Sequence, residues 1–320
     1  MSVKETSIVI VAGPTGSGKS ALAVALAEQF NGVVINADSQ QVYRDLPVLT
    51  AQPNARALAR VPHRLYGVID AGESCSAGRW LTLARAEIAA AAEAGHLAIL
   101  AGGTGLYFEA LLKGLAELPP IPAAAREEAR ALYAKLGGVG FHARLAELDP
   151  ETAARLPPSD TQRLTRAYEV VTATGRSLLD WQRQQEAAPV GRAAAIVLLP
   201  PRDTLYAACD ARVQQMMVDG AEGEVRALLE RRLAPELPAM KAVGVRELGA
   251  FVAGELSCAE AIAAMQQATR NYAKRQYTWF RRRLPEDGSL RKLTLNEQFS
   301  ERILPEIFSF IRQFLLTESG

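Results

Sequence analysis

The segment Gly13–Ser20, with the sequence GPTGSGKS, constrains the fold more than any other part of the chain. It matches the pattern G-x-x-x-x-G-K-[ST] of a phosphate-binding P-loop. The apolar run Ile8–Ala12 before it is typical of a buried strand, and the run Ala21–Ala27 after it is typical of a helix. Because a strand-to-helix turn is the context in which this motif binds phosphate, we predict an anion site here.

Each part of this loop has a predicted task. The glycines let backbone N–H groups wrap an anion, and the helix N-terminus adds about half a positive charge. Lys19 supplies a full charge, and the Ser20 hydroxyl is predicted to hold Mg²⁺. The motif identifies a phosphate but not a reaction, since kinases, hydrolases and some alkyl transferases share it. The predicted phosphate-binding residues are Gly13, Pro14, Thr15, Gly16, Ser17, Gly18, Lys19 and Ser20.

Apolar runs alternate with helical segments along the chain, which predicts an α/β fold with a doubly wound parallel sheet of the P-loop NTPase-like kind. The predicted strands are Ile8–Ala12, Val33–Ala37, Leu65–Ile69, Leu97–Ala101 and Ala194–Leu199. The predicted domains are residues 1–118 (first part of the core), 119–190 (a helical insertion) and 191–320 (the last strand and the C-terminal helices).

Glycine and proline pairs divide the predicted insertion into short helices. These are Ala123–Leu136, Phe141–Leu148, Pro150–Leu156, Asp160–Thr174 and Ser177–Gln185. After the last strand the predicted helices are Arg202–Asp219, Ala221–Arg232, Val245–Ala253, Cys258–Arg283 and Glu301–Leu316.

Composition limits the class of protein. Of 320 residues, 49% are hydrophobic and 22% charged, so a sizeable core can form. With a net charge of +1, a nucleic-acid partner must bind a local basic patch. Scattered cysteines argue against structural zinc and disulfides, and with no leader or membrane-spanning run we expect a cytoplasmic protein without a membrane partner. The cysteines are Cys75, Cys209 and Cys258, and the histidines, which lack metal-ligand spacing, are His63, His96 and His142.

Asp38 follows the predicted strand Val33–Ala37, in the sequence NADSQQVY. The carboxyl ends of parallel strands open onto the ligand crevice, so we expect Asp38 to face the phosphate loop. Two functions stay open here: a ligand of Mg²⁺, or a general base within hydrogen-bond reach of an attacking N–H group. A structural alternative is a helix N-cap.

The segment Gly102–Gly105 follows the predicted strand Leu97–Ala101. Its glycines allow close approach to a ligand, and the Thr104 hydroxyl is predicted to bind a phosphate or the base. The alternative is a glycine-rich turn capped by Thr104. A P-loop hydrolase often places an acidic magnesium ligand at the end of such a strand. This strand ends in Ala-Gly-Gly, which argues against a hydrolase.

A basic segment with interleaved aromatic residues, Arg270–Arg283, is predicted to form one helix. Arg270 and Lys274 lie four residues apart and share a face, and Arg275 follows them. This pattern suits a phosphodiester backbone with aromatic rings available for bases, and also a solvated face over a buried core. Two further basic segments, which also fit ordinary helix N-termini, are Asp160–Arg166 and Lys241–Glu247.

Together these segments resemble the bacterial tRNA dimethylallyltransferases, also called tRNA isopentenyltransferases. The resemblance runs through nearly the whole chain, and the combination of segments is far more specific than the P-loop alone. The matching segments are Gly13–Ser20, Ala37–Ser39 with Tyr43, Pro62–Arg64, Gly102–Thr104 with Leu106–Tyr107, Gln162–Leu164, Val243–Gly244 with Arg246–Glu247, and Ala268–Arg270 with Ala273–Gln276 and Thr278–Trp279.

The resemblance implies a reaction. A dimethylallyl group passes from dimethylallyl diphosphate to the exocyclic amine of the adenine immediately 3′ of the anticodon, with Asp38 as general base. Lys19, Ser20 and Mg²⁺ neutralise the leaving diphosphate, Arg212 approaches the same charge, and Thr104 holds the base or the diphosphate. The adenine must leave the anticodon stack to enter the site. The implied partners are the anticodon stem-loop of tRNA and dimethylallyl diphosphate, and we expect a monomer.

The resemblance also implies a set of tRNA-binding residues. They are Asp38, Ser39, Gln40, Gln41, Thr104, Arg126, Gln162, Arg163, Leu164, Thr165, Arg166, Lys241, Ala242, Val243, Gly244, Val245 and Arg246, and the basic helix adds Arg270, Lys274 and Arg275. The chain departs from the family at Gln52, usually Lys, at Val245, commonly aromatic, and at Ala208, often Arg.

Two other functions fit part of the pattern. A P-loop small-molecule kinase that uses ATP explains the P-loop and Asp38 but not the basic aromatic helix or the insertion. A non-catalytic RNA-binding regulator that keeps its P-loop for switching explains the basic segments but not a carboxylate at a strand end.

Overall fold

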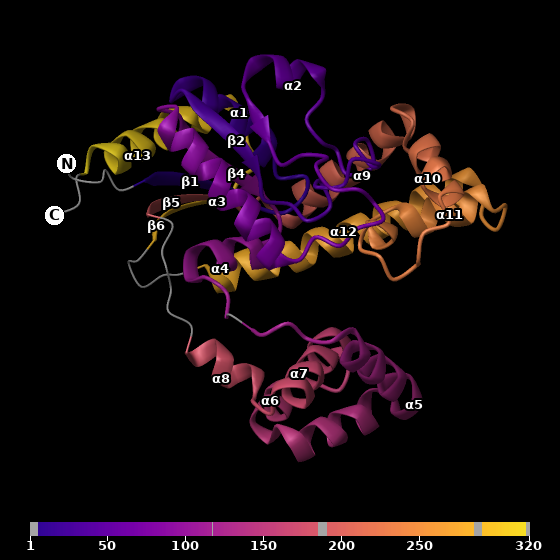
Figure 1. Cartoon of the computed structure of the whole chain (residues 1–320). Helices are drawn as coiled ribbons and strands as arrows, with labels where there is room; N and C mark the ends of the chain where they lie inside the picture. The colour runs from indigo at the N-terminus through magenta and orange to yellow at the C-terminus, as the bar shows by residue number, and fades with distance from the viewer. Residues whose placement is uncertain (1–5, 117, 185–190, 285–289, 318–320) are drawn as a thin grey trace. The chain divides into compact units, whose positions relative to one another are not determined.

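The computed structural model describes residues 6–116, 118–184, 191–284 and 290–317 (Figure 1). Its strands are β1 (Ser7–Ala12), β2 (Gly32–Asn36), β3 (His63–Arg64), β4 (Leu97–Gly102), β5 (Arg192–Leu198) and β6 (Arg291–Leu295). Its α-helices are α1 (Lys19–Gln29), α2 (Ala55–Arg60), α3 (Ala77–Glu93), α4 (Gly105–Lys113), α5 (Ala123–Leu148), α6 (Pro150–Arg155), α7 (Thr161–Thr174), α8 (Leu178–Arg183), α9 (Arg202–Val218), α10 (Ala221–Glu230), α11 (Val245–Val252), α12 (Cys258–Arg283) and α13 (Leu304–Leu316). Two short 3₁₀ helices are η1 (Ala239–Lys241) and η2 (Glu301–Ile303).

The strands form one sheet in the order β3-β2-β4-β1-β5-β6, and every pairing is parallel. The predicted parallel α/β sheet is thus confirmed. The central strand β1 pairs with β4 on one side and β5 on the other, with Val9 beside Ile99 and Ala194. Since β2, β4 and β1 are neighbours, the loops that follow them meet at one edge of the sheet.

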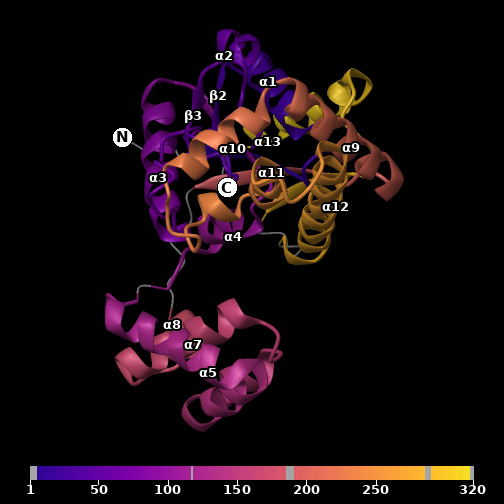
Figure 2. The ribbon, with the colours of Figure 1, turned by 90° about the vertical axis from the view of Figure 1, so that its right-hand side faces the viewer.

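Helices cover both faces of the sheet (Figures 1 and 2). On one face, Val9 and Val11 of β1 pack in a core cluster with Leu22 of α1 and Ile307 of α13. On the other face, Trp80 of α3 stacks on Tyr107 of α4, with ring centroids 4.2 Å apart. The Trp80 indole N–H donates to the Asn36 carbonyl at 2.8 Å, which fixes α3 against the end of β2.

The chain divides into two compact units, one of Met1–Leu112 with Pro189–Gly320 and the other of Lys113–Ala188. The second unit contains α5 to α8 and has its own core around Phe141 and Tyr168. Its longest helix, α5, is interrupted at Gly137, whose φ is 66°, so the predicted break between two helices occurs there. The end of the last predicted helix, Gln185, lies outside the described residues.

One predicted strand was wrong and one observed strand was missed. The predicted strand Leu65–Ile69 is replaced by the two-residue β3, because Leu65 takes a φ of 63° and turns the chain away from the sheet. The strand β6 was not predicted at all. It lies at the sheet edge beside β5, begins with Arg291, and buries only Leu295, so it has no apolar run to reveal it. Within the described residues, no helix is long and apolar enough to cross a membrane.

Candidate active site

The phosphate loop lies between β1 and α1, and two of its carbonyl groups accept hydrogen bonds from the segment after β6. Gly16 O accepts a hydrogen bond from Gln298 Nε2 at 2.8 Å, and Ser17 O accepts one from the Phe299 N–H at 3.2 Å. Gly18, with a φ of 87°, packs so closely that a Cβ there would lie 2.6 Å from Phe299 Cβ. The segment after β6 therefore holds the loop in this conformation.

Lys19, which is buried, and Arg212, which is half-buried, bring two positive charges to one cavity that also contains Asp38. The Lys19 ammonium donates to Pro14 O at 3.4 Å. Burial, opposed by the attraction of Asp38 and assisted by the repulsion of Arg212, lowers the pKa of Lys19 to about 8. Burial also lowers the pKa of Arg212, again opposed by Asp38. Two cations face one carboxylate, so the cavity is suited to an anion.

Asp38 is placed by the buried side chain of Asn36 at the end of β2. Asn36 Oδ1 accepts the Asp38 N–H at 2.8 Å, and Asn36 Nδ2 donates to Asp38 O at 3.0 Å and to Leu65 O at 3.1 Å. The Asp38 carboxylate is 7% exposed, lines the cavity, and accepts the Gln40 N–H through Oδ1 at 3.0 Å. The Asn36 side chain holds the backbone of Asp38 at both its N–H and its carbonyl group, so the carboxylate has a defined orientation.

Thr104 joins the loop after β4 to the loop after β2. Its Oγ1 accepts the Ser39 N–H at 2.8 Å and donates to Ser39 Oγ at 3.2 Å. Its own N–H donates to Ala37 O at 3.2 Å. A Cβ at Gly102 would lie 2.0 Å from Ala37 O, so only glycine permits this close approach. Thr104 thus contacts the residue next to Asp38.

The cavity has a polar part and an apolar part. Lys19, Ser20, Asp38 and Arg212 are among its polar residues. Its apolar side chains are Leu49, Met216, Val243 and Met265. This arrangement suits a ligand that combines an anionic group with a short hydrocarbon chain.

Comparison with known proteins identifies the family. A sequence model described as IPP transferase matches residues 41–283. The tRNA dimethylallyltransferase of Rhodospirillum rubrum is 54% identical over 312 residues, 97% of this chain and 95% of that protein. That of Paramagnetospirillum magneticum is 52% identical over 318 residues, 99% of each chain. The chain belongs to the IPP transferase family.

Solved structures of such enzymes have the same fold. The full-length tRNA isopentenylpyrophosphate transferase of Bacillus halodurans is 32% identical with a TM-score of 0.68, and the match covers 98% of this chain and 97% of that one. A eukaryotic dimethylallyltransferase acting on tRNA is 26% identical with a TM-score of 0.81, over 96% of this chain and 80% of that one. The P-loop NTPase-like α/β fold with a helical insertion is therefore shared with IPP transferases.

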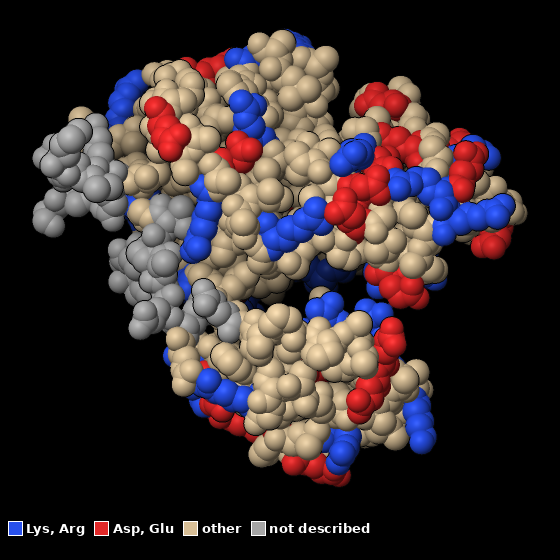
Figure 3. Space-filling view, in the orientation of Figure 1, with Lys and Arg blue, Asp and Glu red and all other residues tan. Residues whose placement is uncertain are grey.

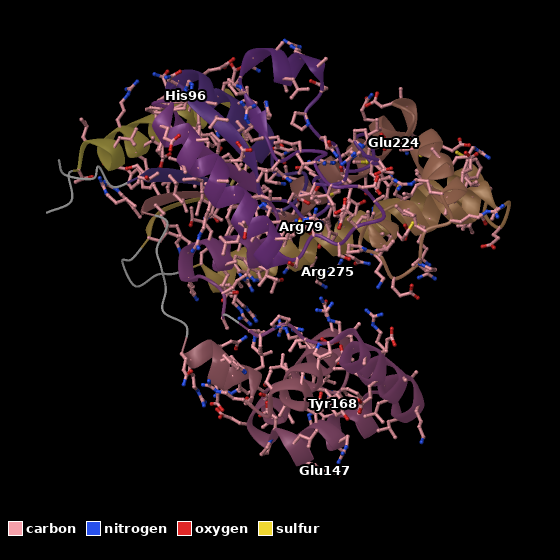
Figure 4. The ribbon with its side chains drawn as sticks, in the orientation of Figure 1. Arg79, His96, Glu147, Tyr168, Glu224 and Arg275 are labelled. Carbon is pink, nitrogen blue, oxygen red and sulfur yellow. The ribbon has the colours of Figure 1, made fainter. Side chains whose placement is uncertain are left out.

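The residues predicted to bind tRNA are distributed over both units of this IPP transferase. Gln40, Gln41 and Val243 line the cavity, and the Val243 N–H donates to Gln40 Oε1 at 3.3 Å. On α12, Lys274 and Arg275 are exposed, and Arg275 is labelled in Figure 4. The remaining exposed ones are Lys241 and Arg246 in the first unit, and Arg126, Gln162 and Arg163 in the second.

Several predicted tRNA-binding residues are less available. Leu164 is fully buried in the core of the second unit, and Ala242 and Val245 are 4% and 3% exposed, so these three side chains pack internally. That their segments bind tRNA stays a prediction. Arg270 forms an ion pair with Asp210 at 2.5 Å. Figure 3 shows that Lys and Arg side chains alternate with Asp and Glu over α10 and α11, in keeping with the small net charge.

Three residues near the site were not predicted. Glu224 of α10 accepts the N–H groups of Val48 and Leu49 at 2.7 and 2.8 Å and so holds the cavity wall (Figure 4). Tyr272 of α12 lines the cavity, and Gln276, one turn later, is buried. Their spacing of four residues places both on one helix face, a signal that the sequence contained.

The other polar candidates are structural. His63, His96 and His142 each bind a backbone carbonyl. Cys75, Cys209 and Cys258 are free thiols. Among the described residues no cluster of His, Cys, Asp and Glu could hold a metal ion.

The three departures from the family pattern have simple structural roles. Gln52 Nε2 donates to Tyr43 O at 2.8 Å, so it closes the loop after β2 by a neutral hydrogen bond. Ala208 packs beside the phosphate loop, with its Cβ 3.5 Å from the position of a Cβ on Gly16. Val245, the first residue of α11, is buried.

Proposed function

We propose that this IPP transferase transfers a dimethylallyl group from dimethylallyl diphosphate to the N6 amine of the adenine immediately 3′ of the anticodon. The observation that carries this proposal is one cavity that combines a phosphate loop, two cationic side chains and four apolar side chains. Membership of the family and the activities of its relatives point to the same reaction.

Different residues act on the two parts of dimethylallyl diphosphate, the diphosphate and the dimethylallyl group. Lys19, the N–H groups of the phosphate loop and Arg212 bind the diphosphate and stabilise the charge that develops as it leaves. The N6 nitrogen forms a bond to C1 of the dimethylallyl group. The C1–O bond breaks, and its electron pair leaves with the diphosphate.

Asp38 takes the proton that N6 must lose. The free amine is far too weak an acid to ionise first, so proton transfer accompanies or follows attack. Thr104, through its bonds to Ser39, holds the segment that carries the base. The adenine must be turned out of the anticodon loop to reach this cavity.

The oxygen atoms available at this site also fit Mg²⁺. This ion prefers oxygen ligands and is commonly held by few protein groups together with substrate phosphates. Ser20 lines the cavity at the start of α1 and would hold the ion through its hydroxyl. When bound, Mg²⁺ neutralises charge on the diphosphate.

Two sets of exposed polar residues, most of them basic, support binding of the tRNA anticodon stem-loop. In the first unit they are Lys241, Arg246, Lys274 and Arg275. In the second unit they are Arg126, Gln162 and Arg163. We propose that phosphate contacts from both supply the affinity for tRNA and position the adenine.

Incubation with unmodified tRNA and dimethylallyl diphosphate tests the proposal. Nucleoside mass spectrometry should show one adenosine that gains a C5H8 group, located 3′ of the anticodon. A parallel incubation with ATP tests the small-molecule kinase, and should give no phosphoryl transfer. If tRNA binds and no prenylated adenosine forms, the RNA-binding regulator becomes the better description.

A further inference from the structure

Gln276 joins the phosphate loop to the loop that carries Thr104. Its side chain, 5% exposed, extends from the buried face of α12. Oε1 accepts the Thr15 N–H at 2.8 Å, and Nε2 donates to Gly103 O at 2.9 Å. One amide thus bridges the ends of β1 and β4 from a helix that lies 261 and 173 residues away in sequence.

The amide is closely packed beside Asp38. A Cβ at Gly103 would lie 2.1 Å from Gln276 Nε2 and 3.3 Å from Asp38 Oδ2. Farther along α12, Trp279 covers Gly105 in the same way, since a Cβ there would lie 2.1 Å from its ring. The two glycines that flank Thr104 both rest on α12, so this helix sets the position of the Thr104 loop.

A neutral primary amide meets both requirements. Thr15 offers a donor and Gly103 an acceptor, and a glutamine side chain has an oxygen that accepts and an NH₂ group that donates. A carboxylate can only accept, so it satisfies Thr15 and repels the Gly103 carbonyl. A methionine of similar length leaves both backbone groups without a partner, which is costly when they are buried.

We propose that Gln276 is a positioning residue for the transfer reaction, holding the diphosphate loop and the Thr104 loop at a fixed separation. The proposal rests on the proposed function, because the two loops carry the leaving group and the base segment. A misplacement of about 1 Å costs up to about 100-fold in rate, so loss of the bridge should reduce the chemical step.

The variant Gln276→Glu separates positioning from a purely structural role. Burial and the nearby Asp38 charge will raise the pKa of the new carboxyl group, so it titrates in an accessible range. When protonated it donates to Gly103 O and preserves the bridge. When ionised it cannot. The ratio of variant to wild-type single-turnover rate should therefore fall as the pH rises, by about 10-fold or more.

Other titratable groups surround these loops. Lys19 begins α1 beside the cavity, and Cys209 of α9 donates its thiol to Thr15 O at 3.7 Å. Arg212 of α9 and Tyr272 of α12 line the same cavity as Asp38. All of these groups are present in wild type as well, so the ratio of variant to wild-type rate reports on the new carboxyl group.

Two more variants complete the experiment. Gln276→Met should lower the single-turnover rate roughly 10- to 100-fold while tRNA affinity changes less than about 3-fold. Gln313→Glu, the same change on the exposed surface of α13, should keep a pH-independent ratio near one.

The outcomes are distinct. Suppose that wild type transfers the dimethylallyl group and that the ratio of Gln276→Glu to wild-type single-turnover rate is the same at every pH. Gln276 then does not position the loops. The same conclusion follows if a folded Gln276→Met variant, checked by its thermal midpoint, keeps the wild-type rate. If wild type itself transfers nothing, the proposed function fails instead.

Discussion

At the scale of single residues, the site depends on a small excess of positive charge. Lys19 and Arg212 both lose water on burial, and the one carboxylate among the cavity's charged residues, Asp38, offsets only part of that cost. A bound diphosphate supplies the missing negative charge. Diphosphate binding and the protonation of Lys19 are therefore thermodynamically linked.

We predict that inorganic pyrophosphate binds less tightly as the pH rises above about 8. The unliganded Lys19 has a pKa of about 8, so above this pH its amine is neutral and binding must recharge it by taking up a proton. Calorimetry in buffers of different ionisation enthalpy measures this uptake. Lys19→Arg keeps its charge, and an equal uptake in that variant would assign the proton to another group.

We predict that Asp38→Asn lowers the single-turnover rate roughly 10²–10⁴-fold, the usual contribution of a general base. Asparagine keeps the shape and can still accept the Gln40 N–H, so tRNA affinity should change only a few-fold. Rates and affinities are measured across a series of Mg²⁺ concentrations. Recovery of the rate at high Mg²⁺ would place Asp38 among the metal ligands.

At the scale of elements, α12 has two faces with different tasks. Its buried face carries Tyr272 and Gln276 toward the site, and its outer face carries Lys274 and Arg275. It begins with a capping box between Ser257 and Glu260, which satisfies N–H groups at its N-terminus. One rigid element can therefore support both RNA binding and the catalytic loops.

We predict that Lys274→Ala and Arg275→Ala each weaken tRNA binding and reduce the magnitude of the slope of log affinity against log salt concentration by about 0.7–0.9. This is the change expected when one phosphate contact, with its release of counterions, is lost. Filter binding at several salt concentrations measures the slope. Arg312→Ala on the exposed face of α13 removes the same charge and should leave the slope unchanged. An equal loss in all three variants would indicate a general charge effect.

The segment after β6 is a second element with a specific task. We predict that Gln298→Leu, which removes the bond to Gly16 O, lowers pyrophosphate affinity roughly 2- to 10-fold. That range corresponds to the net value of one hydrogen bond, about 0.5–1.5 kcal/mol. Isothermal titration measures it, with tRNA affinity as the internal control. An unchanged affinity would mean that the loop keeps its shape without this contact.

At the scale of the whole molecule, we predict that the helical unit contributes to tRNA binding and not to donor binding. The double variant Arg126→Ala with Arg163→Ala should weaken tRNA binding several-fold and leave pyrophosphate affinity unchanged, because both side chains are exposed in the second unit. Parallel titrations with the two ligands check this. A matching loss of pyrophosphate affinity would refute it.

Much of this molecule could be predicted from its sequence because local signals agreed with the final fold. The phosphate loop, the helices after β5 and the break at Gly137 all follow from motif or glycine position. What could not be predicted depends on contacts between distant segments. The edge strand β6 needs β5 as its partner, and Gln276 acquires its role only when β1 and β4 lie side by side.

The family signature and the contacts that lock the phosphate loop occupy different parts of the chain. The family match ends at residue 283, whereas Gln298 and Phe299 contact a loop made some 282 positions earlier. During synthesis on a ribosome, the phosphate loop emerges long before Gln298 and Phe299 do. A nascent chain can thus display the recognisable motifs before the contacts that hold this loop from outside can form.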